Sequence, residues 1–331
     1  MHLHALAAPS SLHVEHGAAP RRAARHAELL RLGRYLLETR YHFTAVTPDT
    51  HERVLARSTE SSGSARDVLG WNRPFQPAAI PQRLFELMLS AEACEQRPDG
   101  AWRATLRCSS IDELLFFHSA FPTRERDAVF FGPDSYRFVR ALLHTVERAE
   151  RVVDLGCGTG AGGIVLARSR EIRGHLLLTD INPRALELAA VNAELNGVEA
   201  HVQHSDVLSQ VEGDVDLVIA NPPYLEDGEG RLYRDGGADL GCALSVRIAL
   251  EVGQRLAAHG GRLVMYSGAP VVEGEDQLLR SLMPVLRETH ARFAYAELDP
   301  DIFGSELARP AYSGVERIAA VLLDAQFDSR S

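Results

Sequence analysis

Residues that could act as rigid hydrogen-bond acceptors beside an aromatic ring stand together at one point of the chain. Asn221, Pro222, Pro223 and Tyr224 follow directly after the apolar run 217–220. A turn alone needs fewer special residues than an amide, two prolines and an aromatic ring. Each proline fixes φ, so its carbonyl becomes a rigid acceptor, and asparagine adds a side-chain acceptor. This spacing predicts a site at the carboxyl end of a buried strand.

A second group of candidate residues is a glycine-rich loop with an acid one strand later. Gly156, Gly158 and Gly160 follow the apolar stretch 152–155, and Asp180 ends the next apolar stretch. Glycines let a ligand approach the backbone closely, and the helix expected from Ala161 favours a negative group at its start. Asp180 suits a ribose hydroxyl. The loop therefore predicts a nucleoside-containing cofactor, and on this evidence alone NAD remains open.

Asp154 separates the two cofactors. It lies inside the strand, two residues before the glycine loop, where dinucleotide sites usually have an apolar residue. A pyrophosphate needs no anion there, whereas the cationic amino group of S-adenosylmethionine does. Hydride transfer also has no evident use for residues 221–224. These features favour S-adenosylmethionine as the cofactor.

The elements that position these residues alternate between strands and helices. Short apolar runs are typical of buried parallel strands, and amphipathic segments at 183–195 and 245–257 predict helices between them. The expected runs lie at 152–156, 176–180, 216–221 and 261–267, with a final strand pair at 292–298 and 315–323. The fold class is α/β, a Rossmann-like, doubly wound, mostly parallel sheet of seven strands, with a smaller N-terminal α+β domain.

Three parts of the chain are expected. Residues 1–20 predict a disordered tail, and 21–127 a recognition domain with amphipathic helices near 21–40 and 80–88. A turn at 98–100 precedes an alternating strand at 102–108, which fits either a winged-helix-like module or a helical cap with a hairpin. The third part, residues 128–325, holds the strand–helix alternation.

Composition excludes several classes of function. All 35 basic residues are arginine, so lysine-dependent nucleotide and Schiff-base sites are excluded. The net charge is −10, of which residues 151–331 carry −11 (16 Arg, 27 Asp+Glu) and residues 1–150 carry +1 (19 Arg, 18 Asp+Glu). This balance does not favour a nucleic-acid partner. The four cysteines form no C-x-x-C pair, so we expect no metal site and a reducing, cytoplasmic location. No run is long enough to span a membrane.

Taken together, residues 128–325 resemble class I S-adenosylmethionine-dependent methyltransferases with an NPPY motif. Those similar to HemK/PrmC methylate protein glutamine, and related enzymes methylate amino groups of adenine or guanine. The segments FFGPDS (130–135) and YRDGGADLG (233–241) resemble this group as well. The first departs from it, because Gly132-Pro133-Asp134 stands where an arginine between prolines is usual.

The resemblance implies a role for each matching residue. Asn221 and Pro222 would accept both N–H groups of the substrate nitrogen, while Pro223 and Tyr224 would contact its flat face. The cofactor-binding residues would be Asp154, Gly156, Gly158, Gly160, Asp180, Ile181, Asp206, Val207 and Asn221. Within that set, Asp180 would bind the ribose, and Ile181, Asp206 and Val207 the adenine.

The expected function is methyl transfer from S-adenosylmethionine to an amide or amino nitrogen, with a protein glutamine side chain as the first choice of acceptor. An exocyclic amine of RNA or DNA is the alternative, followed by a small-molecule amine. A nicotinamide dehydrogenase and a donor-binding scaffold are the readings from other classes. The expected partner is a protein, with no membrane contact, and the oligomeric state is left open.

Overall fold

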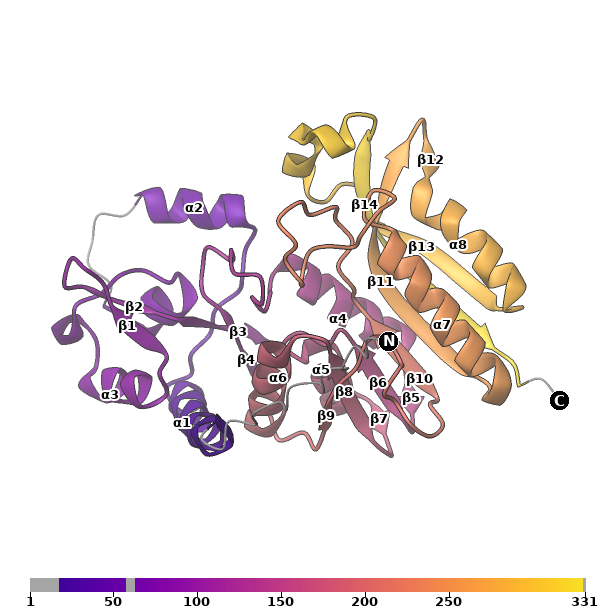
Figure 1. The fold of residues 1–331 in the computed structure, drawn as a ribbon. Coiled ribbons are helices and arrows are strands. Elements are labelled where there is room, and N and C mark those ends of the chain that lie inside the picture. The colour runs from indigo at the N-terminus through magenta and orange to yellow at the C-terminus, as the bar shows by residue number, and fades with distance from the viewer. Residues whose placement is uncertain (1–17, 58–62, 330–331) are drawn as a thin grey trace, which may run out of the picture.

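A mostly parallel sheet organises the C-terminal two thirds of the chain (Figure 1). The computed structural model describes residues 18–57 and 63–329. Seven strands follow the order β13-β14-β11-β10-β6-β8-β9, and the short β12 pairs with β11. Strands β11, β10, β6, β8 and β9 run parallel, whereas β14 is antiparallel to both β11 and β13. The predicted fold class is confirmed.

The bounds of these elements follow the predicted pattern closely. The strands are β5 (Arg148–Ala149), β6 (Val152–Leu155), β7 (Glu171–Ile172), β8 (Leu176–Asp180), β9 (His201–His204), β10 (Leu217–Ala220), β11 (Gly261–Val272), β12 (Glu275–Asp276), β13 (Arg292–Asp299) and β14 (Arg317–Phe327). The helices are α4 (Pro133–Thr145), α5 (Ala161–Ser169), α6 (Pro183–Leu195), α7 (Ala243–His259) and α8 (Gln277–Glu288), with short helical turns η3 (Gly304–Ala308) and η4 (Pro310–Tyr312). Strand β9 was missed by the sequence analysis.

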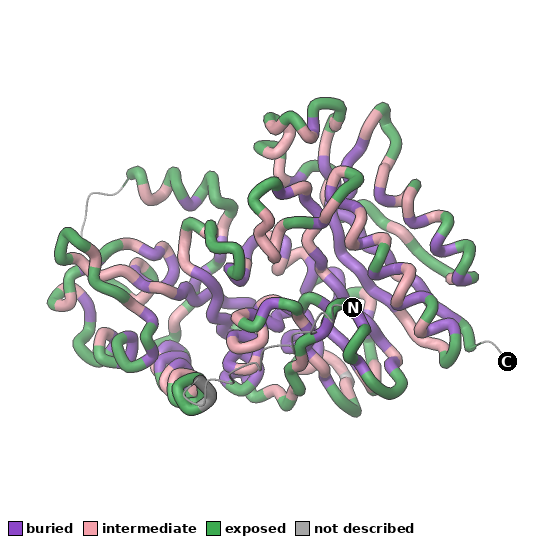
Figure 2. The backbone as a smooth tube through the Cα atoms, in the orientation of Figure 1, coloured by how far each residue is buried: buried purple, intermediate pink, exposed green. Residues whose placement is uncertain are grey.

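Helices cover both faces of the sheet. One core cluster joins side chains of α4, α5 and α6 to one face, and another joins α7 and α8 to the opposite face. Neighbouring strand residues divide between them: Val152 belongs to the first cluster and Val153 to the second. Figure 2 shows the buried residues following these strands. Such burial on both sides is why the strands read as continuous apolar runs.

The N-terminal part of the described chain is built from short elements. They are α1 (Ala18–Glu38), α2 (Pro48–Arg57), η1 (Arg66–Gly70), η2 (Pro77–Ala79), α3 (Gln82–Ser90), β1 (Cys94–Gln96), β2 (Trp102–Ala104), β3 (Leu106–Ile111) and β4 (Leu114–Ser119). Strands β1 and β2 form the hairpin expected around Pro98–Gly100. A core cluster joins these elements to α6 through Leu188 and Val191.

Two expectations for this part need correction. Ala18, Ala19 and Pro20 were assigned to a disordered tail, but they form the first turn of α1, where proline is tolerated. Residues 1–17 lie outside the described residues. The single strand expected at 102–108 is interrupted at Thr105, because β2 pairs with β1 whereas β3 pairs with β4. The division at residues 127/128 stays a prediction.

Asparagine side chains of α6 complete the hydrogen bonding of β4. Asn192 accepts from the Phe117 N–H (2.8 Å) and donates to the Phe117 carbonyl (3.1 Å) and the Thr159 carbonyl (3.0 Å). Asn196 pairs in the same way with both backbone groups of Leu115. These buried amides therefore tie the N-terminal hairpin to α6, and Asn192 also holds the glycine loop.

We predict that Asn192→Ala lowers the free energy of unfolding by about 2–4 kcal/mol, because each buried backbone group left without a partner costs about 1–3 kcal/mol. Urea denaturation followed by circular dichroism measures this. The control is Gln82→Ala, since Gln82 bonds only Glu86 on the exposed face of α3. A loss below about 0.5 kcal/mol for Asn192→Ala, the size of an ordinary surface change, would contradict the assigned role.

Candidate active site

The glycine loop leaves β6 with its backbone in the left-handed region. Gly156, Gly158 and Gly160 have φ values of 61°, 54° and 76°, which glycine adopts without strain. A Cβ on Gly156 or Gly158 would meet nothing within 4 Å, so this side of the loop is open. The Gly158 N–H donates to Asp180 Oδ2 (2.9 Å). The loop is thereby fixed to the end of the neighbouring strand β8.

Asp180 ends β8 and faces the same pocket as the glycine loop. Besides the Gly158 N–H, it accepts the Asn182 N–H at Oδ1 (2.8 Å). Burial raises the pKa of this carboxyl, and the backbone hydrogen bonds oppose the rise. Each oxygen keeps a lone pair for a further donor. The next residue, Ile181, lines the pocket with a side chain that is 43% exposed, an apolar surface on which a flat ring can pack.

Asp154 lies one strand away, buried within β6 and lining the pocket. Its Oδ2 accepts the Gly163 N–H of α5 (2.8 Å). Burial raises its pKa to about 7; the Gly163 hydrogen bond opposes this, and the charge of Asp180 adds to it. A cation bound beside Asp154 would relieve the cost of ionising it.

The third acidic position, Asp206, differs from the other two because its side chain is exposed. Both of its oxygens accept from the guanidinium of Arg247 (3.0 and 2.9 Å). The following Val207 is buried, with φ of 49°, an unusual conformation for a β-branched residue and one typical of functional sites. Both residues line the pocket. Arg247, which the sequence analysis missed, holds Asp206 in place.

The NPPY residues leave β10 at its carboxyl end and turn into the same pocket. Asn221 is half-buried, and among the described residues its side chain has no hydrogen-bond partner. Pro222 is buried and Pro223 half-buried. The ring of Tyr224 is only 7% exposed and meets Phe303 (ring centroids 6.0 Å apart), so Tyr224 offers the pocket little more than one edge.

The sequence-predicted residues therefore converge on one pocket. Those lining it are Asp154, Gly156, Gly158, Asp180, Ile181, Asp206, Val207, Asn221, Pro222, Pro223 and Tyr224. Gly160 does not line it, because this residue forms the N-cap of α5 instead. The open ends of four neighbouring parallel strands thus supply the pocket, as in other open α/β sheets.

Sequence reasoning missed a buried polar group beneath the NPPY residues. Asp134, in the first turn of α4, accepts the Tyr266 hydroxyl (2.7 Å) and pairs with Arg137 (3.2 Å). Asp134 also lines the pocket, and burial raises its pKa. The sequence analysis singled out the segment FFGPDS (130–135) but assigned Asp134 no role. An acid next to a proline at the start of a helix is common for reasons of helix stability alone.

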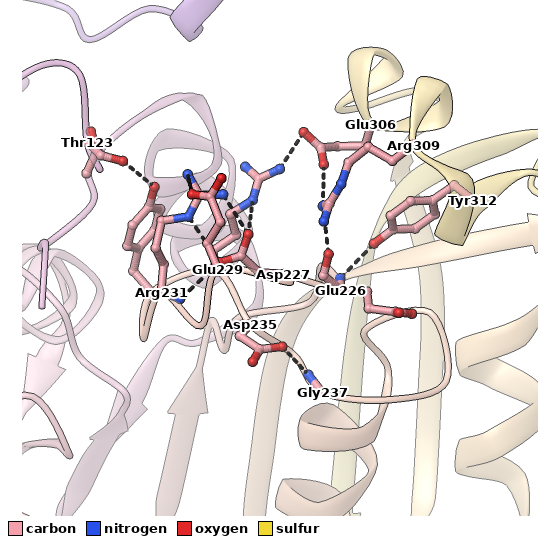
Figure 3. A network of polar contacts seen from close by, with 12 residues as sticks. Thr123, Glu226, Asp227, Glu229, Arg231, Asp235, Gly237, Glu306, Arg309 and Tyr312 are labelled. Atoms are coloured by element: carbon pink, nitrogen blue, oxygen red, sulfur yellow. Dashed lines mark hydrogen bonds and ion pairs between the residues drawn. The ribbon is translucent and has the colours of Figure 1, made fainter. Parts of the chain in front are cut away.

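The segment after Tyr224 is held over the pocket by charged groups (Figure 3). The Asp227 side chain is fully buried and accepts from Arg231 (2.6 Å), which lowers the pKa of Asp227 to about 2. Arg234 lies 3.5 Å from Asp227 and pairs with Glu306 of η3. Tyr233, between the two arginines, lines the pocket.

Comparisons with known proteins agree with this geometry. Residues 133–233 match the family model described as the methyltransferase small domain. A ribosomal RNA small subunit methyltransferase C of Haemophilus influenzae is 39% identical over 135 residues, which cover 40% of this chain and 38% of the relative. A release factor glutamine methyltransferase of Deinococcus radiodurans is 28% identical over 188 residues, which cover 56% of this chain and 66% of the relative. Among solved structures, M. jannaschii TYW2 in complex with AdoMet matches at 13% identity with a TM-score of 0.45, covering 68% of this chain and 87% of that one.

The family match and the two relatives confirm the resemblance to S-adenosylmethionine-dependent methyltransferases. The chain contains a methyltransferase domain of the S-adenosylmethionine-dependent class, and S-adenosylmethionine is its cofactor. This decides against the nicotinamide dehydrogenase alternative. The chain spans between 38% and 66% of the length of these two relatives. No helix in the described ranges is long and apolar enough to cross a membrane.

We predict that Asp180→Ala weakens binding of S-adenosylhomocysteine at least about tenfold. Hydrogen bonds to a charged group contribute about 1.5–3 kcal/mol each, and 1.4 kcal/mol is a factor of ten. Isothermal titration calorimetry measures the affinity, with Glu199→Ala, an exposed acid outside the pocket, as the control. Unchanged affinity in a folded Asp180 variant would show that Asp180 does not bind the ribose.

The pKa of Asp154 gives a second prediction, which concerns pH. With a pKa of about 7 in the free protein, this carboxyl is mostly neutral at pH 6 and mostly ionised at pH 8. If the carboxylate binds the donor's amino group, affinity for S-adenosylhomocysteine should rise about tenfold across that interval. Asp154→Asn should make the affinity nearly independent of pH. The same calorimetric titration at pH 6, 7 and 8 tests both, and an equal pH slope in the two proteins would rule out the role.

Proposed function

We propose that this protein transfers a methyl group from S-adenosylmethionine to a planar amide or amino nitrogen, with a protein glutamine side chain as the first choice of acceptor. One observation carries the proposal. The half-buried side chain of Asn221 lines the donor pocket and, among the described residues, has no hydrogen-bond partner. Asn221 is not among the fully buried polar groups that lack a partner, so its amide is accessible from the pocket and free to bind a substrate.

The chain's own residues would act by positioning. The Asn221 side-chain oxygen and the Pro222 carbonyl would accept the two N–H groups of the acceptor and aim its nitrogen at the donor's methyl group. Proline fixes the direction of that carbonyl. When bound, S-adenosylmethionine supplies a methyl group already activated by the sulfonium charge. Holding the two reactants in line is then the main source of rate acceleration, with no general base among the assigned roles.

Asp180 would hold the ribose of the donor, and Asp154 would hold the amino group of its methionine part. Ile181, Asp206 and Val207 would surround the adenine, with Asp206 kept in place by Arg247. Tyr224 and Pro223 would limit how the acceptor can lie in the pocket, because Tyr224 is itself packed against Phe303. Each of these roles is part of the proposal.

Charge supports a protein acceptor. The net charge of −10 disfavours a polyanion, and it is the sum of −11 on residues 151–331 and +1 on residues 1–150. Residues 21–127 would then serve as the recognition part. The second candidate, an exocyclic amine of RNA, is favoured by the similarity to a protein named as a ribosomal RNA methyltransferase. Both acceptors present a planar nitrogen to the same residues.

Methyl transfer from radiolabelled S-adenosylmethionine into fractionated cell extract tests the proposal. Label in the protein fraction, resistant to nuclease and recovered as methylglutamine after total digestion, is the expected result. Label recovered in RNA as a methylated base would replace the first acceptor by the second. Label confined to oxygen, sulfur or carbon positions would refute nitrogen methylation altogether.

We predict that Asn221→Ala lowers kcat about 100-fold or more, as losing one positioned polar group does in other enzymes. Affinity for S-adenosylhomocysteine should change little, because the proposed partner of Asn221 is the acceptor. Steady-state kinetics at saturating donor, with calorimetry alongside, separates the two effects. Lost donor binding with kcat preserved at saturation would show that Asn221 serves the cofactor alone.

A further inference from the structure

In the N-terminal part, outside the donor pocket, three arginines lie near enough to a buried histidine for their charges to lower its pKa. We call His51, Arg73, Arg103 and Arg107 the basic cluster. His51 comes from α2, Arg73 follows η1, and the other two come from β2 and β3. His51 is 1% exposed and Arg107 only 4%, whereas Arg73 and Arg103 are half-buried. The inner residues are thus covered, and the outer arginines connect the cluster to solvent.

None of the three arginines forms an ion pair within the described residues. Among the described residues, their hydrogen bonds go to neutral backbone carbonyls. Arg107 Nε donates to Gly70 (2.9 Å), Arg73 to Val54 (3.4 Å), and Arg103 to Asn72 (3.3 Å) and Phe121 (2.5 Å). The acid of η1, Asp67, is taken up by Ser64. Within the described ranges, three positive charges therefore have no carboxylate partner, an expensive arrangement for buried groups.

Polar atoms without partners collect in the same place. Of the four buried side-chain nitrogens or oxygens in the described residues that lack a hydrogen bond, three belong to the cluster: His51 Nδ1, Arg73 Nε and an Arg107 terminal nitrogen. A buried polar group without a partner is destabilising, and more so when it is charged. Burial, and next the charge of Arg107, lower the pKa of His51 to about 4, while burial lowers that of Arg107 to about 10.

We propose that the basic cluster is a binding site for one oxyanion, a carboxylate or phosphate group. Guanidinium groups match the geometry of such oxygens, and an anion would satisfy the unpaired donors of Arg73 and Arg107 together. Its negative charge would also offset part of the three positive charges in a place where water screens them poorly. A surface groove for a nucleic-acid backbone would instead expose its arginines, but the inner arginine here is buried.

The cluster is connected to the wall of the donor pocket. His51 stacks on the ring of Phe121 (centroids 4.1 Å apart), and Arg103 holds the Phe121 carbonyl. Two residues further on, the Thr123 carbonyl accepts the hydroxyl of Tyr233, which lines the pocket (Figure 3). The anion can therefore be a free ion or an anionic group on the acceptor molecule, and the experiment distinguishes these two sources.

The test uses the full chain with S-adenosylhomocysteine saturating the donor pocket. Inorganic phosphate is titrated in at constant ionic strength, with chloride as the matched ion, and binding is followed by calorimetry and by thermal unfolding. Phosphate should bind and raise the unfolding temperature of the wild type. Arg107→Met should weaken phosphate binding at least about tenfold, as loss of a charged hydrogen bond would. The control is Arg83→Met, since Arg83 is 56% exposed and pairs with Glu86.

The outcome is decided by comparison between variants. Binding by the wild type and Arg83→Met, but not by Arg107→Met, supports the site. No phosphate binding to the wild type, or equal binding by all three proteins, overturns it. Should Arg107→Met fail to fold, as judged by its S-adenosylhomocysteine affinity, Arg73→Met replaces it, because Arg73 is half-buried and carries one of the unpaired donors.

A second arm identifies the source of the anion, and it rests on the proposed function. Methyl transfer to the fractionated extract is repeated with increasing phosphate. A phosphate-dependent rise in the acceptor's KM, absent in Arg107→Met, assigns the anion to the acceptor. Transfer that is insensitive to phosphate in the wild type assigns it to a free ion. Because the binding arm needs no methyl acceptor, its result stands apart from that of the transfer assay.

Discussion

The position of Asn221 depends on the close approach of three glycines to Tyr224, three residues further along the chain. A Cβ on Gly236 would lie 2.7 Å from the Cα of Tyr224, and one on Gly241 would clash with the Tyr224 carbonyl. A Cβ on Gly268 of β11 would clash with the ring of Tyr224. Packing this dense leaves the strand exit one conformation. The backbone of Asn221 is therefore fixed indirectly, through the packing of Tyr224 against these three glycines.

The charged groups above the pocket extend the same constraint. Residues 225–235 form a closed loop after the NPPY residues. Its two ends are joined by the Gly236 N–H, which donates to the Leu225 carbonyl (2.8 Å), so Gly236 lies next to the residues that follow β10. Asp227 pairs with Arg231 and Arg234 in the middle of this segment. Glu306, through Arg234, and Arg309, through the Glu226 carbonyl, attach the segment to the C-terminal turns. Removing one partner would leave a buried charge unpaired, which costs far more than an exposed ion pair contributes.

Sequence patterns predicted the parts of the molecule that local physics decides. Helix α6 was predicted at its exact bounds because proline favours a first turn and Gly197 follows the end. Strand β8 was equally clear as an apolar run. Strand β9 was missed, since His201-Val202-Gln203-His204 is polar and mostly exposed at the sheet edge. No local pattern marks such a strand, which forms through its pairing with β8.

The same limit explains why the basic cluster could not be foreseen. Arg103 and Arg107 alternate with apolar residues, a pattern that places arginine on a solvent-facing side of one strand. The structure divides that strand between two hairpins, and the second half, β3, is buried throughout. Whether an arginine is buried is decided by partners distant in the sequence, here α2 and the residues after η1. The net charge of residues 1–150 is equally uninformative, because a sum near zero conceals three arginines that form no ion pair within the described part of the chain. Any attraction exerted by this part of the protein therefore acts at short range and on a single group, since at distances beyond about 10 Å salt screens the cluster and the negative C-terminal part governs the field.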